Sequence, residues 1–160
     1  RPEERAPADD DPSSPLVTLQ PKGSLPPLFF AHPAAGVVFP YVDLARRLGD
    51  ERPFVALQAS GLDGASPPDL TIEAMAARYV AAIKTRQPEG PYHLGGYSFG
   101  CLVAYEMACQ LSEQGERVAL LALLDEPWCA SSLAEALANQ GVVLYEGDGR
   151  GNFARESTGP

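Results

Sequence analysis

The chain has 160 residues, with 12 Lys or Arg against 21 Asp or Glu and a formal net charge of −9. This length is sufficient for one domain with a buried core, and the negative charge argues against nucleic acid or an anionic membrane as a partner. No apolar stretch approaches the roughly 18 residues of a spanning helix, and no signal-peptide pattern is present, so we expect a cytoplasmic protein.

The first 15 residues differ in composition from the rest of the chain. The stretch "RPEERAPADDDPSSP" is charged and rich in proline, with almost nothing to bury, which predicts a disordered interdomain linker at residues 1–15. Because the chain starts with Arg1 rather than Met, we expect it to be a piece of a longer protein. Cys101, Cys109 and Cys129 form no paired C-x-x-C motif, so we expect no metal site. Cys101 and Cys109 lie eight residues apart on a predicted helix, which indicates buried thiols.

From residue 16 onward, apolar runs typical of strands alternate with helical patterns. Residues 16–20 and 25–32, separated by "PKGS", predict a hairpin. A helix from residue 39 should turn Val42, Leu44, Ala45 and Leu48 inward and end at Gly49, and Thr71 should cap a second helix. Further strands are predicted at 54–58, 90–97 and 117–125, with a helix after Ser98. This alternation predicts an α/β fold with a mostly parallel sheet covered on both faces.

A G-x-S-x-G pentapeptide lies between the predicted strand at 90–97 and the helix that follows. It consists of Gly96, Tyr97, Ser98, Phe99 and Gly100. In a nucleophile elbow, the serine takes strained backbone angles and the flanking glycines avoid clashes between strand and helix. The serine hydroxyl is then held at the carboxyl edge of the sheet, near backbone N–H groups that can meet a developing oxyanion. The alternative is a tight turn in which Ser98 only caps the helix.

A second stretch, "FFAHPAAGVVFPY", has the form of a loop that could supply another oxyanion donor. Small residues and Gly36 follow a strand here, so the backbone could approach a substrate closely. The residues themselves leave an ordinary strand-to-helix loop equally open.

Three stretches together resemble the thioesterase domains that end nonribosomal peptide and polyketide synthases. They are "LVTLQPKGSLPPLFFAHPAAG", "YHLGGYSFGCLVAYEMACQL" and "VALLALLDEP". The resemblance covers residues 16–128, and animal fatty-acid synthase thioesterases are a close second. It implies an α/β-hydrolase fold of which only the amino-terminal part is present. Residues 129–160 would hold the start of a lid helix, "ASSLAEALANQ", and an irregular tail.

The same resemblance implies roles for individual residues. Ser98 matches the nucleophile, and the amides of Phe99 and Ala34 match the oxyanion hole, while Gly96 and Gly100 flank the elbow. Asp125, at the end of the next strand, matches the acidic member of the triad; alternatively it caps the turn "DEPW". The substrate would be an acyl or peptidyl thioester on the phosphopantetheine of an upstream carrier domain, with no cofactor of the thioesterase's own.

One element of the family pattern is missing from this sequence. No histidine follows Asp125, and only His32 and His93 are present. His93 lies about 16 Å before Ser98 along an extended strand, too far for proton transfer, and the resemblance implies a structural role for His32. We therefore expect a thioesterase-type hydrolase or cyclase that is nearly inactive as this chain alone. A non-catalytic carrier-docking fragment and a generic serine esterase are the alternatives.

Overall fold

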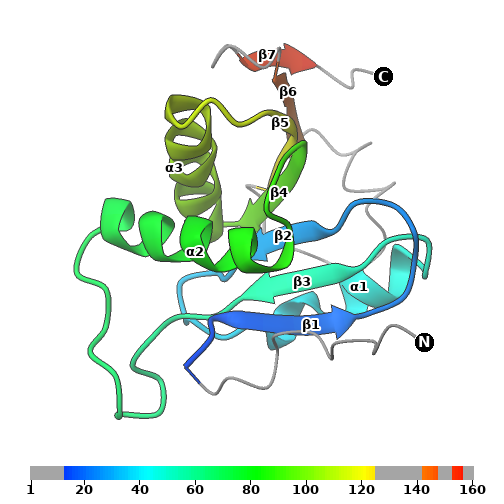
Figure 1. The fold of residues 1–160 in the computed structure, drawn as a ribbon. Coiled ribbons are helices and arrows are strands. Elements are labelled where there is room, and N and C mark those ends of the chain that lie inside the picture. The colour runs from blue at the N-terminus through cyan, green and yellow to red at the C-terminus, as the bar shows by residue number, and fades with distance from the viewer. Residues whose placement is uncertain (1–12, 125–141, 148–152, 157–160) are drawn as a thin grey trace, which may run out of the picture.

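The computed structural model describes residues 13–124, 142–147 and 153–156, and the side chains of the last two segments are not described. Strands and helices alternate along the first segment, as the sequence predicts (Figure 1). The elements are β1 (Leu16–Gln20), β2 (Leu28–Ala31), a 3-10 helix (Phe39–Tyr41), α1 (Val42–Arg47), β3 (Phe54–Leu57), α2 (Ile72–Arg86), β4 (Tyr92–Tyr97), α3 (Phe99–Glu113), β5 (Val118–Leu124), β6 (Val142–Gly147) and β7 (Phe153–Glu156).

The strands form one mixed sheet in the order β1-β3-β2-β4-β5-β6-β7. The four strands β3, β2, β4 and β5 are parallel to one another, which confirms the expected parallel arrangement for the centre of the sheet. The predicted hairpin of the first two strands is wrong. β1 pairs antiparallel with β3, with Leu16 opposite Leu57, and β2 lies between β3 and β4. The burial pattern gives the reason, because all four residues of β2 are buried whereas β1 buries only Leu16, as an edge strand does.

Helices cover both faces of the sheet, which gives three layers (Figure 1). On one face, α2 and α3 pack against alternate strand residues such as Phe29, Val55 and Leu94. On the other face, α1 and the 3-10 helix pack against residues such as Phe30 and Phe54. Because successive side chains of a strand point to opposite faces, each apolar strand contributes buried residues to the hydrophobic clusters on both faces of the sheet.

The three helices predicted within the described residues are present as α1, α2 and α3, with one correction. Thr71 caps α2 by accepting the N–H of Ala74 at 3.1 Å, as predicted. In α1, Leu44 and Ala45 are buried, but Val42 is exposed. Tyr41 occupies the inward position instead, since it lies three and four residues before Leu44 and Ala45 and is fully buried.

The segment expected to be an irregular tail contains two strands. β6 pairs antiparallel with β5, and β7 pairs antiparallel with β6, which extends the sheet beyond its parallel centre. Figure 1 shows these strands at the end of the sheet farthest from β1. The predicted lid helix lies outside the described residues.

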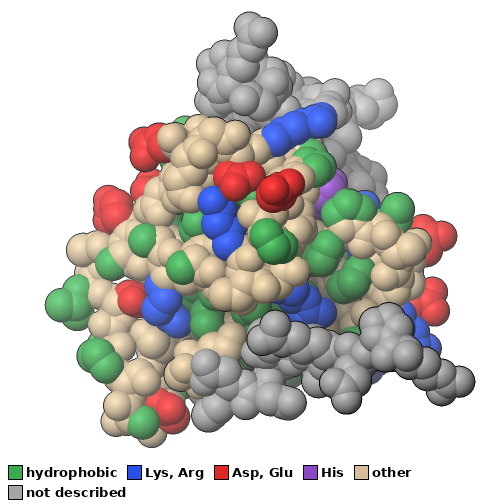
Figure 2. Space-filling model, viewed as in Figure 1, with side chains coloured by type: hydrophobic (Ala, Val, Ile, Leu, Met, Phe, Trp, Pro, Cys, Tyr) green, Lys and Arg blue, Asp and Glu red, His purple; other side chains and the backbone are tan. Residues whose placement is uncertain are grey.

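On the face shown in Figure 2, acidic and basic side chains are intermingled and apolar ones are dispersed between them. No helix within the described segments is long and apolar enough to cross a membrane.

Candidate active site

The backbone at Ser98 has an uncommon conformation. Its φ is 53° and its ψ is −119°, and in the described segments it is the one non-glycine residue with positive φ. Ser98 lies between the end of β4 and the start of α3, and its side chain is exposed. A serine held in a strained turn at the carboxyl end of a parallel strand has the geometry of a nucleophile elbow.

The two glycines of the pentapeptide are required by close backbone contacts. A Cβ atom at Gly96 would overlap the carbonyl group of Gly100 and lie 2.9 Å from the Cys101 nitrogen. A Cβ atom at Gly100 would overlap the carbonyl oxygen of Ala31 and lie 2.9 Å from that of His32. The absent side chains therefore let α3 begin directly against the ends of β4 and β2.

Hydrogen bonds tie this turn to the neighbouring strand. The Ser98 N–H donates to the carbonyl oxygen of Leu124 at 3.0 Å. The Cys101 thiol lies 3.3 Å from the same oxygen and 3.3 Å from the carbonyl oxygen of Gly96. Cys101 is half-buried, as is Cys109, so the expectation of buried thiols holds only in part; Cys129 lies outside the described residues. The turn is thus fixed to the last described residue of β5.

The loop after β2 lies beside the turn, since Gly100 packs on its first residues. Its Ala34 is exposed, and Gly36 adopts a φ of 78°. The Gly36 carbonyl accepts the Ala59 N–H at 3.0 Å, which joins this loop to the one after β3. Within the described segments, neither the Ala34 N–H nor the Phe99 N–H donates a backbone hydrogen bond, so both are available to a ligand.

Tyr41 connects the loop to the serine turn, a role that the sequence does not predict. Its hydroxyl donates to the Ala31 carbonyl at 2.6 Å and accepts the Tyr97 N–H at 2.9 Å. β2 ends at Ala31, which is paired with Gly96, so Tyr97 has no partner on β2 and the Tyr41 hydroxyl takes that place. Burial raises the pKa of Tyr41, which keeps the hydroxyl protonated as a donor. The signal in the sequence was the spacing of Tyr41 before Leu44.

Replacing Tyr41 by phenylalanine is expected to lower the free energy of unfolding by about 2 to 4 kcal/mol, because two buried backbone groups lose their partner. Tyr79→Phe is the matched control. Tyr79 is equally buried, but its hydroxyl has no hydrogen-bond partner among the described residues, so its loss should cost little. Urea denaturation of the two variants measures the difference, and equal losses of stability would contradict this role of Tyr41.

The two histidines occupy different places, and neither is hydrogen-bonded to Ser98. His93 is half-buried near the amino end of β4, opposite Leu28, whereas Ser98 follows the carboxyl end of that strand. His32 is buried at the end of β2, and its Nε2 makes no hydrogen bond with any described residue, Ser98 included. Burial is the main cause of a lowered pKa in both histidines.

These lowered pKa values predict that acidification destabilises the fold. Between the ordinary histidine pKa of 6.5 and the lower values of the folded state, the unfolded chain binds more protons. The free energy of unfolding must therefore fall as the pH drops below 6.5, by at most about 1.4 kcal/mol per pH unit for each histidine. The free energy of unfolding, measured by urea denaturation at several pH values below 6.5, should fall less steeply with pH in His93→Gln than in the wild type. A stability that rises on acidification would contradict the prediction.

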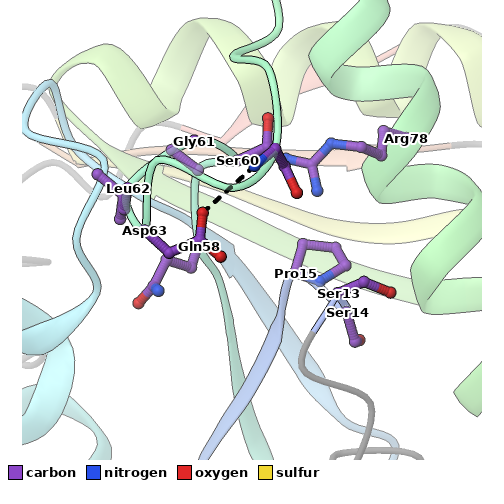
Figure 3. A pocket seen from close by; sticks show the side chains of 11 residues that line it. Ser13, Ser14, Pro15, Gln58, Ser60, Gly61, Leu62, Asp63 and Arg78 are labelled. Carbon is purple, nitrogen blue, oxygen red and sulfur yellow. Dashed lines mark hydrogen bonds between the residues drawn. The ribbon is translucent and has the colours of Figure 1, made fainter.

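A pocket of about 350 Å³ opens at the carboxyl end of β3. Figure 3 shows Arg78 of α2 reaching into it, between the loop after β3 and the residues that precede β1. Arg78 is paired with Asp69 at 2.9 Å, and Asp69 also accepts the Ser60 hydroxyl at 3.2 Å. Ser98 is not among the residues that line this pocket.

Asp125 lies outside the described residues, so its role as the acidic member of the triad stays a prediction. The structure brings the strained Ser98 and the N–H groups of Phe99 and Ala34 together at the carboxyl edge of the sheet. Tyr41 links the two segments that carry them. No group of His, Cys, Asp and Glu suited to a metal ion occurs among the described residues.

Comparison with known proteins shows the family to which this chain belongs. The sequence profile of the thioesterase domain family matches residues 26–142, so the chain belongs to this family. Malpibaldin synthetase of Mortierella alpina is 39% identical over 145 residues, which cover 91% of this chain and 2% of that protein. The nonribosomal peptide synthetase btyA of Aspergillus terreus is 46% identical over 115 residues, covering 71% of this chain and 12% of the synthetase.

Solved thioesterase domains have the same fold. The NocB thioesterase domain from the nocardicin cluster is 38% identical, with a TM-score of 0.60 over 65% of this chain and 46% of that one. The Vlm2 thioesterase domain is 33% identical, with a TM-score of 0.60 over 70% of this chain and 48% of that one. The chain therefore spans about half the length of these domains and a small part of the synthetases.

Proposed function

We propose that this chain supplies the nucleophile and oxyanion hole of a thioesterase that releases an acyl or peptidyl chain from a carrier domain. The observation that carries the proposal is the strained, exposed Ser98 at the junction of β4 and α3. The chain's family and its relatives among nonribosomal peptide synthetases support a thioester as the bond that is broken.

The proposed reaction has two steps. The Ser98 oxygen attacks the thioester carbonyl, and the negative charge that develops on the carbonyl oxygen is stabilised by the N–H groups of Phe99 and Ala34. When the C–S bond breaks, the acyl chain remains on Ser98 as an ester and the proton from Ser98 goes, by way of the base, to the departing thiol. Water or a nucleophile of the acyl chain then releases the product and regenerates Ser98.

For Asp125 we propose the acidic role that the resemblance implies. The covalent structure supports this, because the Asp125 nitrogen is bonded to the Leu124 carbonyl carbon, whose oxygen accepts the Ser98 N–H. Asp125 therefore directly follows, in the sequence, a residue that is hydrogen-bonded to the serine turn. A carboxylate here would orient the histidine base and stabilise its charged form. Since neither His32 nor His93 is hydrogen-bonded to Ser98, we propose that this base is a third histidine, outside the present sequence.

The direct test is hydrolysis of an acyl thioester by the full-length protein that contains this chain. Ser98→Ala should reduce turnover by at least about 10³-fold, and Asp125→Ala should also cause a large loss. Ser112→Ala, in the last turn of α3, is the matched control and should retain full activity.

The same assay separates the alternatives. Equal rates with a carrier-bound thioester and a simple oxygen ester would favour a generic serine esterase. Turnover that survives Ser98→Ala would overturn the proposed function, because another residue would then be the nucleophile. No turnover with any acyl thioester would also overturn it and would favour a docking role.

A further inference from the structure

The orientation of the Pro33–Ala34 peptide group is fixed by two hydrogen bonds to its carbonyl oxygen. The His32 Nδ1 atom lies 2.7 Å from the Pro33 oxygen, and the Gly36 N–H donates to the same oxygen at 2.9 Å. A carbonyl oxygen can only accept, so the proton of a neutral His32 must be on Nδ1. The imidazole therefore acts here as a hydrogen-bond donor.

This carbonyl and the Ala34 N–H belong to the same peptide group. The peptide is trans, because the one cis bond in the described segments is Gly90–Pro91. In a trans peptide the C=O and N–H bonds point in opposite directions. Holding the Pro33 oxygen toward His32 and Gly36 therefore directs the Ala34 N–H away from them, on a residue that is exposed to solvent. Polarisation of the carbonyl by two donors also strengthens the N–H as a donor.

The imidazole is itself held firmly in place. His32 is only 2% exposed, and its backbone N–H donates to the Leu57 carbonyl at 3.1 Å. Its ring stacks on Phe99 with centroids 5.9 Å apart and meets the edge of Tyr79 at 6.0 Å. One side chain thus touches both segments that supply the proposed oxyanion donors, through a hydrogen bond to the Ala34 loop and through stacking on Phe99.

We propose that His32 is a positioning residue that sets the oxyanion hole by fixing the Pro33–Ala34 peptide and supporting Phe99. The proposal rests on the proposed function, because it assigns His32 to the same site. It also accounts for a buried histidine near the proposed nucleophile that is not hydrogen-bonded to it.

A pair of substitutions in the full-length protein tests the hydrogen bond. In His32→Asn the side-chain amide can place its NH₂ where Nδ1 was, whereas the longer His32→Gln places it near the position of Nε2. We expect Gln to lower kcat for acyl thioester hydrolysis by about 10- to 100-fold with KM changed less than about 2-fold, since oxyanion stabilisation acts in the transition state. Asn should restore most of the rate. Equal kcat in Asn and Gln, or a loss expressed only in KM, would overturn the proposal.

A second measurement does not depend on turnover. In the 160-residue chain, ¹⁵N NMR of the imidazole at neutral pH should show the proton of His32 on Nδ1. A proton on Nε2 would overturn the proposal whatever the kinetics show. The two proposals fail differently: wild-type protein without Ser98-dependent turnover overturns both, whereas Ser98-dependent turnover unaffected by His32→Gln overturns only the role of His32.

Discussion

Replacing Gly100 by alanine is expected to lower the free energy of unfolding by about 3 kcal/mol or more, although alanine is the better helix former. The added Cβ would overlap the Ala31 carbonyl oxygen and approach that of His32 to 2.9 Å. Both contacts are with backbone at the end of β2, so the start of α3 would have to move away from the sheet. Thioester turnover should fall with stability, because Ser98 is two residues away.

Gly115→Ala is the matched control for this substitution. Gly115 follows the end of α3, its φ is 79°, and a Cβ there would meet nothing within 4 Å. Only the backbone strain remains, which costs about 1 to 2 kcal/mol. Urea denaturation of both variants gives the comparison, and a cost for Gly100→Ala no larger than that for Gly115→Ala would show that α3 does not need this close contact.

Replacing Ser98 by glycine is expected to change activity and stability in opposite directions. Turnover should be abolished with the loss of the nucleophile. Stability should rise by about 1 kcal/mol, because a non-glycine residue at φ 53° and ψ −119° carries strain of about 1 to 3 kcal/mol, part of which is offset by the greater freedom of glycine in the unfolded chain.

Ser98→Ala separates the two effects. Alanine keeps the Cβ and hence the strain, so this variant should be inactive but no more stable than the wild type. Thermal or urea unfolding of the three proteins, with turnover measured on the same samples, tests the prediction. If glycine and alanine have the same effect on stability, the strain assigned to Ser98 is not released by removing the Cβ.

The element types could be predicted from the sequence because the local signals were strong. Continuous apolar runs such as "LFFA" and "VALLALL" indicated buried strands, and the Thr71 cap marked the start of α2. Which strands pair with one another was harder to predict from the sequence. The short "PKGS" segment between β1 and β2 suggested a hairpin, but the fully apolar β2 gains more by pairing with parallel neighbours on both sides, which leaves β1 to pair with β3 at the edge.

The elbow was also evident in the sequence, since G-x-S-x-G followed by a helix strongly restricts the backbone. The supporting hydrogen bonds were not. Tyr41 bonds to Tyr97, which is 56 positions away in the sequence. The hydrogen bond from His32 to Pro33 depends on a side-chain rotamer. Neither bond can be predicted from composition or spacing. Likewise, β6 and β7 come from a glycine-rich segment with little periodicity.

The most direct test of the proposed mechanism is to find where the acyl group is held during turnover. The full-length protein is mixed with an acyl thioester, quenched during the reaction, digested and sequenced by tandem mass spectrometry. The proposed mechanism predicts a mass increase equal to the acyl group on Ser98, in the peptide that contains Gly96 and Gly100, and none in Ser98→Ala. Acylation of another residue, or turnover with no acylated protein at any time, would contradict it.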